Sequence, residues 1–438
     1  MFPPGPRSPA LFQIARWVMQ PLGMLREYHA KFGDVFTLRT PRNEKFVIVA
    51  DPDLIKQVVT ADPATLLAGK GNATVLEPML GKFSLLTLDG ADHLRQRRLL
   101  LPAFHGERMQ AYGSVMTEVT DASIDTWPMH QPFALHPMMQ AITLDVILRT
   151  VFGVASADRQ GNLRARLIEL LEVATNPWLL FSGVVGFSPL SIPWLPISKL
   201  KAAVDEALYD MIRDRRRRSS AAGGSVDVLS MMLEARDDRG AAMSDVEVRD
   251  ELVTLLLAGH ETTATSLAWT FERLLAHPHV LEKLRAELAV GREEYLDCVI
   301  RETLRVRPIL PLIGRHVATT YQLGTWSLPP GTRVAPSIFL AAMNPKAYPN
   351  PERFAPDRWI GVKPDPYLWL PFGGGIRRCI GMAFAQVEMR LVIQAVVSRT
   401  RMRLVDGPAS VVRRGITLAP AGGTRVILHE RSQHESAA

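Results

Sequence analysis

One long helical pattern in the middle of the chain constrains the fold more than any other feature. It begins at Ser244-Asp245-Val246-Glu247, which has the form of a capping box, and it runs to His277-Pro278, where a helix should stop. The pattern covers about 30 residues, so the helix would be roughly 45 Å long. A helix of this length can cross a whole domain, and the remaining elements must pack around it.

The remaining segments predict a mainly α fold with minor β structure. Apolar helical periodicity dominates residues 90–300 and 381–397, whereas strand-like segments occur near residues 30–60, 310–345 and 400–430. Within the first of these, FTLRT and KFVIVA read as a hairpin. Length alone suggests two or three domains. Because we find no internal repeat and no convincing linker, we expect residues 1–438 to form a single domain with a β-rich lobe and a helical lobe.

The composition excludes several classes of protein. Hydrophobic residues make up 47% of the 438 residues, which is enough for a large core. The two cysteines, Cys298 and Cys379, are too few for a disulfide scaffold or for a thiolate-rich zinc or iron–sulfur site. Each cysteine therefore needs its own explanation.

Part of the net charge of +7 comes from one basic run. Five arginines lie within six positions, namely Arg213, Arg215, Arg216, Arg217 and Arg218. Nucleic-acid binding needs a basic face with stacking aromatics. This run instead precedes Ala221-Ala222-Gly223-Gly224, so we interpret it as a solvated helix end and exclude a nucleic-acid partner. A basic surface that docks an acidic protein partner is the more plausible alternative.

We expect neither a signal peptide nor a transmembrane anchor. The first residues, MFPPGPRSP, are rich in proline and contain no basic segment that leads into an apolar run. The longest uncharged stretch, residues 173–198, has the length of a membrane span, but prolines and glycines interrupt it. We therefore predict an apolar surface loop there, and a cytoplasmic protein.

The middle of the long helix carries polar groups that suggest a proton relay. Its sequence is Ala258-Gly259-His260-Glu261-Thr262-Thr263, and a glycine inside a helix costs about 1 kcal/mol relative to alanine. The Thr262 hydroxyl can bond the Ala258 carbonyl four residues back, which together with Gly259 would loosen the helix and open a groove. An acid and a hydroxyl in a groove can transfer protons. A buried helix that merely tolerates polar residues explains the hexapeptide equally well.

A glycine-rich loop surrounds Cys379. Residues 372–381 contain three consecutive glycines, which allow the backbone to approach a bulky group closely. A helical run follows, so Cys379 would sit at a helix N-terminus, where the dipole and free amides stabilise a thiolate. Such a thiolate could be a nucleophile, a redox sensor or a metal ligand. Cys298 lies on another helix, and we expect it to be a buried, small apolar residue.

A third group of residues predicts a buried ion-pair network. Glu302 and Arg305 are three apart, so they share one helix face. A buried pair of this kind needs further partners to offset its desolvation. Arg358, in Pro356-Asp357-Arg358-Trp359, is a candidate for the third member, and Arg353 competes with it.

Together these segments resemble the cytochrome P450 superfamily of haem-thiolate monooxygenases. The family's haem loop, F-x-x-G-x-R-x-C-x-G, is matched by Phe372, Gly375, Arg377, Cys379 and Gly381. Its [AG]-G-x-[DE]-T motif is matched at residues 258–262, its E-x-x-R motif at 302–305 and its P-x-R-[FW] motif at 356–359, which favours Arg358 over Arg353. The four motifs occur in the family's order, and the resemblance covers nearly the whole chain.

The resemblance implies the family's fold, a triangular prism in which haem b lies between a long central helix and the cysteine loop. It makes Cys379 the ligand of the iron, with a thiolate that favours O–O cleavage and with Phe372 packed beside the sulfur. Glu261 and Thr262 would deliver protons to the distal oxygen. The network of Glu302, Arg305 and Arg358 would brace the proximal side.

The resemblance also implies contacts to the propionates and to the substrate. The family's paired propionate contacts correspond to His93 and Arg97, and Arg315 and Arg377 are further cationic candidates. By position, the distal pocket would be lined by the loop of residues 75–86 and by Leu255, Ala258, Leu312, Ile313, Ile416 and Thr417. These residues are mostly apolar, which favours a hydrophobic substrate such as a fatty acid, a terpenoid or a steroid-like molecule.

The implied reaction inserts one oxygen atom from O2 into that substrate. The sequence contains no fused flavin or iron–sulfur module, so electrons would come from a separate ferredoxin or flavodoxin with its NAD(P)H reductase, docked near Arg377 and Arg378. We expect a monomer of the soluble bacterial type.

Two alternatives stay open. The first is a haem-thiolate peroxygenase or coupling enzyme, against which Glu261-Thr262 argues, and the second is a non-catalytic haem sensor, which would need no proton relay.

Overall fold

The computed structural model describes residues 2–40, 44–106, 108–153, 161–176, 192, 195–219 and 227–432. Its helices are α1 (Ala10–Met19), α2 (Pro21–Phe32), α3 (Pro52–Val59), α4 (Ala68–Leu80), α5 (Gly90–Leu100), α6 (Arg108–Asp125), α7 (Leu135–Thr150), α8 (Gly161–Ala174), α10 (Pro196–Ser219), α11 (Val228–Glu234), α12 (Asp245–Ala276), α13 (Pro278–Leu288), α14 (Glu294–Val306), α15 (Ile338–Ala342) and α16 (Met382–Arg399). Its strands are β1 (Val35–Arg39), β2 (Lys45–Val49), β3 (Leu66–Leu67), β4 (Pro132–Ala134), β5 (Arg315–Val317), β6 (Tyr321–Leu323), β7 (Trp326–Leu328), β8 (Arg333–Pro336), β9 (Thr400–Leu404), β10 (Val411–Arg414), β11 (Thr417–Pro420) and β12 (Arg425–Arg431). The prediction of a mainly α fold with minor β structure is confirmed.

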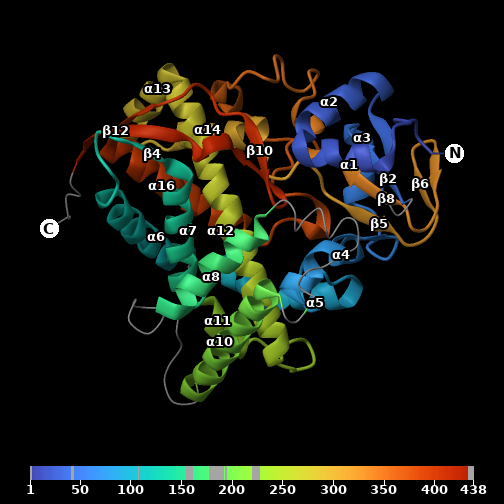
Figure 1. The fold of residues 1–438 in the computed structure, drawn as a ribbon, viewed down its shortest axis with the longest axis horizontal. Coiled ribbons are helices and arrows are strands. Elements are labelled where there is room, and N and C mark those ends of the chain that lie inside the picture. The colour runs from blue at the N-terminus through green and yellow to red at the C-terminus, as the bar shows by residue number, and fades with distance from the viewer. Residues whose placement is uncertain are drawn as a thin grey trace.

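Helix α12 is the predicted long helix and forms the centre of the molecule. It has 32 residues, which corresponds to roughly 48 Å. The capping box is complete: the Glu247 amide donates to Ser244 Oγ over 3.3 Å, and the Ser244 amide donates to Glu247 Oε2 over 2.7 Å. In Figure 1, α12 runs through the middle of the ribbon, and α7, α10, α14 and α16 pack against it.

The largest sheet lies beside the N-terminal helices at one side of the molecule (Figure 1). Its strand order is β1-β2-β8-β5-β3, and it begins with the predicted hairpin, in which Val35 pairs with Val49. Successive side chains of β2 point to opposite faces of the sheet, so Val47 and Val49 belong to one apolar cluster and Ile48 to another. The sheet is therefore covered on both faces, and it presents β5 toward the helical part of the chain.

Two smaller β structures come from the C-terminal part of the chain. Strand β12 pairs with β9 and with β4, which precedes α7. Strands β10 and β11 form a separate antiparallel hairpin. This hairpin approaches α12, because the Trp269 indole donates to the Leu418 carbonyl over 2.9 Å.

The arginine-rich run differs in part from the expected solvated helix end. It belongs to the last turns of α10, where Arg215 pairs with Asp227 at 2.5 Å and Arg216 pairs with Asp245 at 2.8 Å. These two ion pairs connect α10 to the starts of α11 and α12. Arg213 and Arg217 pair with acids one helical turn away. Arg215 and Arg216 therefore tie helices together, whereas Arg213 and Arg217 stay exposed on the surface of α10, as expected of a solvated helix end.

The predicted apolar loop at residues 173–198 lies mostly outside the described residues. At its edges, α8 extends to Ala174 and α10 begins at Pro196, so both ends are helical. Within the described ranges, the helices lack the combination of length and apolar character that a bilayer span requires.

Candidate active site

The loop before α16 holds Cys379 through a close approach to α3. Gly375 has a φ of +64°, and a Cβ at this position would lie 2.0 Å from the Val59 carbonyl oxygen. Only glycine can therefore occupy it. The Cys379 amide donates to the Phe372 carbonyl over 2.9 Å and closes the turn. The Phe372 ring packs edge-on against Trp369, with ring centroids 6.1 Å apart.

The Cys379 thiol suits a metal ligand. Its side chain is exposed, yet protein surrounds it closely enough that burial raises the pKa of the thiol. A side chain with both properties faces an internal hollow. The Gly381 amide, Arg97 and Arg378 lower the pKa, but burial is the largest effect. The helix N-terminus alone, on which the sequence prediction relied, does not secure a thiolate, whereas a bound metal cation would.

Basic side chains from three elements gather near this thiol. They are His93 and Arg97 on α5, Arg315 on β5 and Arg377 on a short 3-10 turn, Gly375–Arg377. Burial is the main reason that the pKa of His93 falls to about 3, and Arg377, Arg97 and Arg315 lower it further. Burial also lowers the pKa of Arg315 to about 10. The four side chains are therefore close enough to repel one another.

This cluster fits a haem with two negatively charged propionates. Among the described residues, Asp89 is the acid that pairs with it, through Arg377 at 2.5 Å. The buried Nδ1 atom of His93 has no hydrogen-bond partner. The cluster supplies surplus positive charge and an imidazole nitrogen without a partner, and the thiol nearby is accessible. An anionic porphyrin would use all three.

Arg377 was expected near the propionates and also near the docking site of the electron donor, and its low exposure does not fit the second expectation. Its guanidinium turns inward, where it binds Asp89 and donates to the carbonyls of Leu85 and Leu88 over 3.2 and 2.5 Å. It therefore fastens the α4–α5 connection to the cysteine loop. Arg378, the next residue, is exposed.

One face of α12 is accessible near the middle of the helix. Ala258 is exposed and Thr262 is half-buried, although most of the central part of this helix is buried. The Thr262 hydroxyl donates to the Ala258 carbonyl over 2.6 Å, as the sequence predicts. The predicted loosening of the helix is not observed, because α12 is unbroken here. A Cβ on Gly259 would lie 3.2 Å from Ile147 Cδ1, so this glycine instead allows α7 to pack closely.

Glu261 is buried and held by residues from three elements. Arg414 Nε donates to Oε1 over 3.0 Å, and Gln140 Nε2 donates to Oε2 over 2.8 Å. The Thr265 hydroxyl also donates to Oε1, over 3.3 Å, and His136 Nε2 lies 3.8 Å away. None of these contacts involves the Thr262 hydroxyl, which bonds its own helix.

Sequence reasoning missed Arg414, Gln140 and His136. They lie on β10 and α7, more than a hundred residues from Glu261, and no local motif marks them. Burial lowers the pKa of His136 to about 3, with Arg414 and His260 acting in the same direction, so this imidazole is neutral at physiological pH.

The predicted ion-pair network is assembled around Glu302. Arg305 binds it through two parallel bonds of 2.8 and 2.9 Å, and both side chains are fully buried. Arg358 Nε donates to Glu302 Oε1 over 3.1 Å and Trp359 Nε1 donates to Oε2 over 2.9 Å. Arg353 contributes only its backbone carbonyl, which accepts from Arg305. Arg358 is thus the third charged member.

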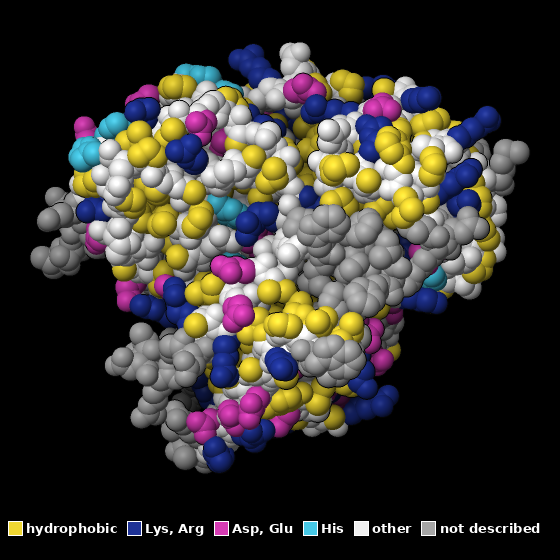
Figure 2. Space-filling model, in the orientation of Figure 1, with side chains coloured by type: hydrophobic (Ala, Val, Ile, Leu, Met, Phe, Trp, Pro, Cys, Tyr) yellow, Lys and Arg dark blue, Asp and Glu magenta, His cyan; other side chains and the backbone are white. Residues whose placement is uncertain are grey.

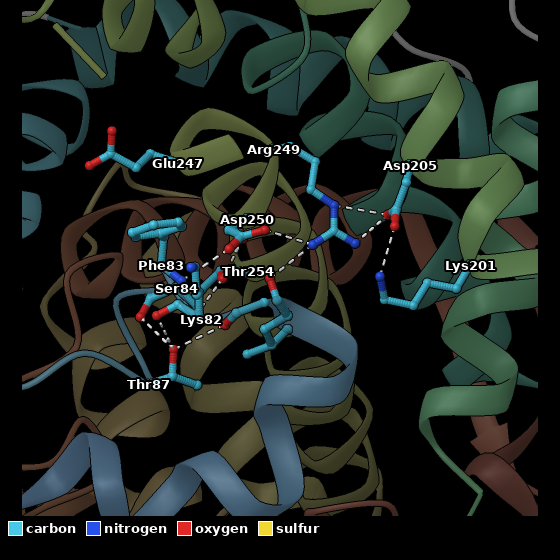
Figure 3. A network of polar contacts seen from close by, with 12 residues as sticks. Lys82, Phe83, Ser84, Thr87, Lys201, Asp205, Glu247, Arg249, Asp250 and Thr254 are labelled. Atoms are coloured by element: carbon cyan, nitrogen blue, oxygen red, sulfur yellow. Dashed lines mark hydrogen bonds and ion pairs between the residues drawn. The ribbon is translucent and has the colours of Figure 1, made fainter. Parts of the chain in front are cut away.

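A second polar network fixes the loop after α4 against α12 (Figure 3). The Phe83 amide donates to Asp250 Oδ2 over 3.0 Å, and the Thr254 hydroxyl donates to Ser84 Oγ over 2.7 Å. Arg249 binds Asp250 and reaches Asp205 on α10. The segment that was expected to line the distal pocket as a loop, residues 75–86, is therefore bound to α12, and its first part is the end of α4.

The other expected pocket residues lie in different surroundings. Ala258 and Ile416 are exposed, whereas Leu255 and Thr417 are buried. Ile313 is partly buried near the cysteine loop, and Leu312 packs against a core cluster that includes Met24, Phe36 and Phe339.

Comparisons with known proteins agree with this geometry. The family model described as Cytochrome P450 matches residues 2–421. The chain belongs to the cytochrome P450 family. It is 39% identical over 434 residues to the putative cytochrome P450 135B1 of Mycobacterium tuberculosis, covering 97% of this chain and 90% of that one. It is 37% identical over 439 residues to the putative cytochrome P450 138 of the same organism, covering 98% and 96%.

Solved structures show the same fold. The heme domain of cytochrome P450DA has a TM-score of 0.86 at 25% identity, covering 99% of both chains. Retinoic acid bound cyanobacterial CYP120A1 has a TM-score of 0.84 at 24% identity, covering 98% of this chain and 99% of that one. The protein is therefore a cytochrome P450 monooxygenase whose cofactor is haem. When bound to a cysteine thiolate, haem supplies the activation of O2 that this chemistry requires.

Proposed function

We propose that this cytochrome P450 inserts one oxygen atom from O2 into a hydrophobic substrate, such as a fatty acid, a terpenoid or a steroid-like molecule. The observation that carries the proposal is the open face of α12, where Ala258 and Thr262 stand beside a buried, firmly held carboxylate at Glu261. A hydroxyl on an accessible helix face and a buried acid beside it can pass protons from the protein. The expected pocket residues are mostly apolar, Leu255 and Ile416 among them, which favours an apolar substrate.

In this proposal the proximal residues bind and orient the cofactor. Cys379 is the iron ligand, and Phe372, Gly375 and Gly381 shape the loop around it. His93, Arg97 and Arg315 hold the propionates. Their positions on α5 and β5, and their lack of carboxylate partners among the described residues, support this assignment.

The distal residues manage protons and water. Thr262 presents a hydroxyl that can turn from the Ala258 carbonyl toward the substrate side, and Glu261 exchanges protons with it after its bonds to Arg414 or Gln140 relax. The network of Glu302, Arg305 and Arg358 braces the segment before the cysteine loop, because Arg305 also donates to the carbonyls of Ala342 and Pro351.

The electron donor in this proposal is a separate ferredoxin- or flavodoxin-type protein with its NAD(P)H reductase. The inward position of Arg377 leaves Arg378 as the exposed arginine of the cysteine loop. An acidic donor would be attracted there, and the attraction would weaken with added salt. We propose a cytoplasmic monomer.

Turnover with a surrogate donor chain tests the function. Haem absorbance shifts are first used to select binders from panels of fatty acids, terpenes and steroids. The selected compounds are then incubated with NADPH and a surrogate reductase and ferredoxin, and hydroxylated product and peroxide are measured. We expect the Thr262→Ala variant to consume NADPH but release peroxide, and Thr262→Ser to restore product.

Two outcomes would contradict the proposal. Product formed with added peroxide but not with O2 and the donor chain would indicate a peroxygenase. Haem binding without turnover of any bound compound would indicate a sensor.

A further inference from the structure

A cavity of about 470 Å³ lies apart from the cysteine loop. It is a half-open pocket between the α1–α2 junction, the end of α14, α15 and the start of β10, and its volume is typical of small-molecule pockets. Its lining is mixed: the polar and charged residues are Gln20, Arg26, Arg307 and Glu352, and the larger apolar residues are Met19, Leu22, Val306, Phe339, Met343 and Val411. Figure 2 shows the surface hollowed between its two upper lobes, where Figure 1 places α2 opposite β10. None of the lining residues belongs to the candidate haem site.

A partly buried cation lines this cavity, and it has no carboxylate partner within the described ranges. Arg307 follows α14, and its buried Nε atom has no hydrogen-bond partner. Its Nη1 atom donates to the neighbouring Val306 carbonyl over 3.2 Å, and its guanidinium stacks 4.9 Å from the centre of the Trp269 ring. Burial lowers the pKa of Arg307 to about 10, so it remains charged at neutral pH.

The neighbouring acids are already engaged. Glu272 favours the charged form of Arg307, but both of its oxygens bind Arg273, and Oε1 also accepts from the Ala409 amide. At the rim, Glu352 pairs with Arg26 at 3.1 Å, and both side chains are exposed. The charges at the rim therefore cancel, and the positive charge of Arg307 is left over.

We propose that this cavity binds a small organic monocarboxylate with an apolar body. The carboxylate would accept hydrogen bonds from Arg307, whose planar guanidinium matches its geometry. The body would pack against Met19, Phe339 and Met343. A single surplus charge matches a monoanion better than a phosphate, and the apolar part of the lining would not replace the hydration of a phosphate. This inference does not depend on the proposed function.

Calorimetry with decanoate tests the proposal on the haem-loaded protein. Haem absorbance is followed in parallel, so that binding at the haem is counted separately. We expect one decanoate site that leaves haem absorbance unchanged, and roughly tenfold weaker binding of the uncharged decanol there. Arg307→Met should weaken the decanoate site by a similar factor, whereas Arg425→Met, which removes an exposed arginine elsewhere, should not.

A second variant keeps Arg307 and fills the cavity. Gly23 lines the cavity, and a Cβ there would meet no atom within 4 Å. Gly23→Leu should therefore abolish the site, while Gly23→Ala, which makes the same backbone change with one methyl group, should keep it. Crystals soaked with a bromine-labelled decanoate would show its position. Decanoate found only in the haem pocket, or binding that Gly23→Leu and Arg307→Met leave intact, would overturn the proposal.

Discussion

Arg414 connects the acid of the central helix to the end of α8. Its Nε atom lies 3.0 Å from Glu261 Oε1, and its Nη2 atom lies 3.5 Å from the Thr175 hydroxyl. The turn after Arg414 also approaches α8, because a Cβ on Gly415 would lie 2.8 Å from the Ala174 carbonyl oxygen. The orientation of the Glu261 carboxylate therefore depends on where the end of α8 stands relative to the β10–β11 hairpin.

Replacing Arg414 should disturb proton delivery more than folding. In Arg414→Met, Glu261 keeps Gln140 and Thr265 but loses its charged partner, so the carboxylate becomes less well positioned for proton transfer. We expect a smaller fraction of NADPH to appear as product, more peroxide, and a changed pH profile of this coupling. Arg414→Lys should recover part of the loss, because it restores the charge.

Arg425→Met provides the control for Arg414. Arg425 pairs with Asp406 at 3.3 Å on an exposed surface. Such a pair contributes about 0–1 kcal/mol, and coupling should not change. An Arg414→Met variant with normal coupling and a normal pH profile would show that Arg414 is only structural.

Replacing Gly81 tests how much the attachment of the distal loop to α12 contributes to stability. Its φ of +94° strains any other residue, and a Cβ there would lie 2.2 Å from the Asp250 carboxylate. We expect Gly81→Ala to lower the free energy of unfolding by about 1–3 kcal/mol for backbone strain, and by a further 1–3 kcal/mol or so for the clash. Urea denaturation, monitored through the haem absorbance, measures this loss of stability.

Gly33 provides a matched control for Gly81. It also ends a helix, with a similar φ of +84°, but a Cβ there would meet no atom within 4 Å. Gly33→Ala should therefore show the strain without the clash. Equal losses in the two variants would mean that contact with Asp250 does not stabilise the loop.

Glu388 should make stability depend on pH. It is buried on α16, its Oε1 atom has no hydrogen-bond partner, and burial raises its pKa from 4.5 to about 8. The folded protein therefore keeps a proton that the unfolded chain loses above pH 4.5, so stability decreases as the pH rises from about 4.5 to about 8.

Glu388→Gln removes this titration. The variant should match the wild type near pH 4.5 and be more stable near pH 8, by on the order of 1–3 kcal/mol in urea denaturation. Glu430→Gln, at an exposed position, should show no such divergence. Parallel stability curves for Glu388→Gln and the wild type would mean that Glu388 is ionised in the folded protein.

Local sequence signals were sufficient for the elements and for the short motifs. The capping box at Ser244 and the break at Pro278 gave the ends of α12, because both act within one helical turn. The spacing of Glu302 and Arg305 placed them on one face of α14. Arg358 could be proposed as their partner because its motif identified it, and the structure brings it into contact with Glu302.

Contacts between distant elements could not be read from the sequence. Arg414 reaches Glu261 from a hairpin that closes late in the chain, and no periodicity relates the two. The inward turn of Arg377 depends on Asp89, which is nearly three hundred residues away. The loosening of the helix expected at Gly259 is absent, and Gly259 instead allows Ile147 of α7 to pack closely, a tertiary contact that no local pattern indicates.

The most direct test of the account is the identity of the haem ligand. Cys379→Ser and Cys298→Ser are purified, and haem content and the absorbance of the reduced carbon monoxide complex are measured. We expect Cys298→Ser to keep the absorption band characteristic of a thiolate-bound haem, because Cys298 is buried in the core and its thiol pKa is raised by burial. Cys379→Ser should lose that band, with or without loss of the haem itself. A Cys379→Ser protein that retains both the haem and the thiolate band would contradict the account.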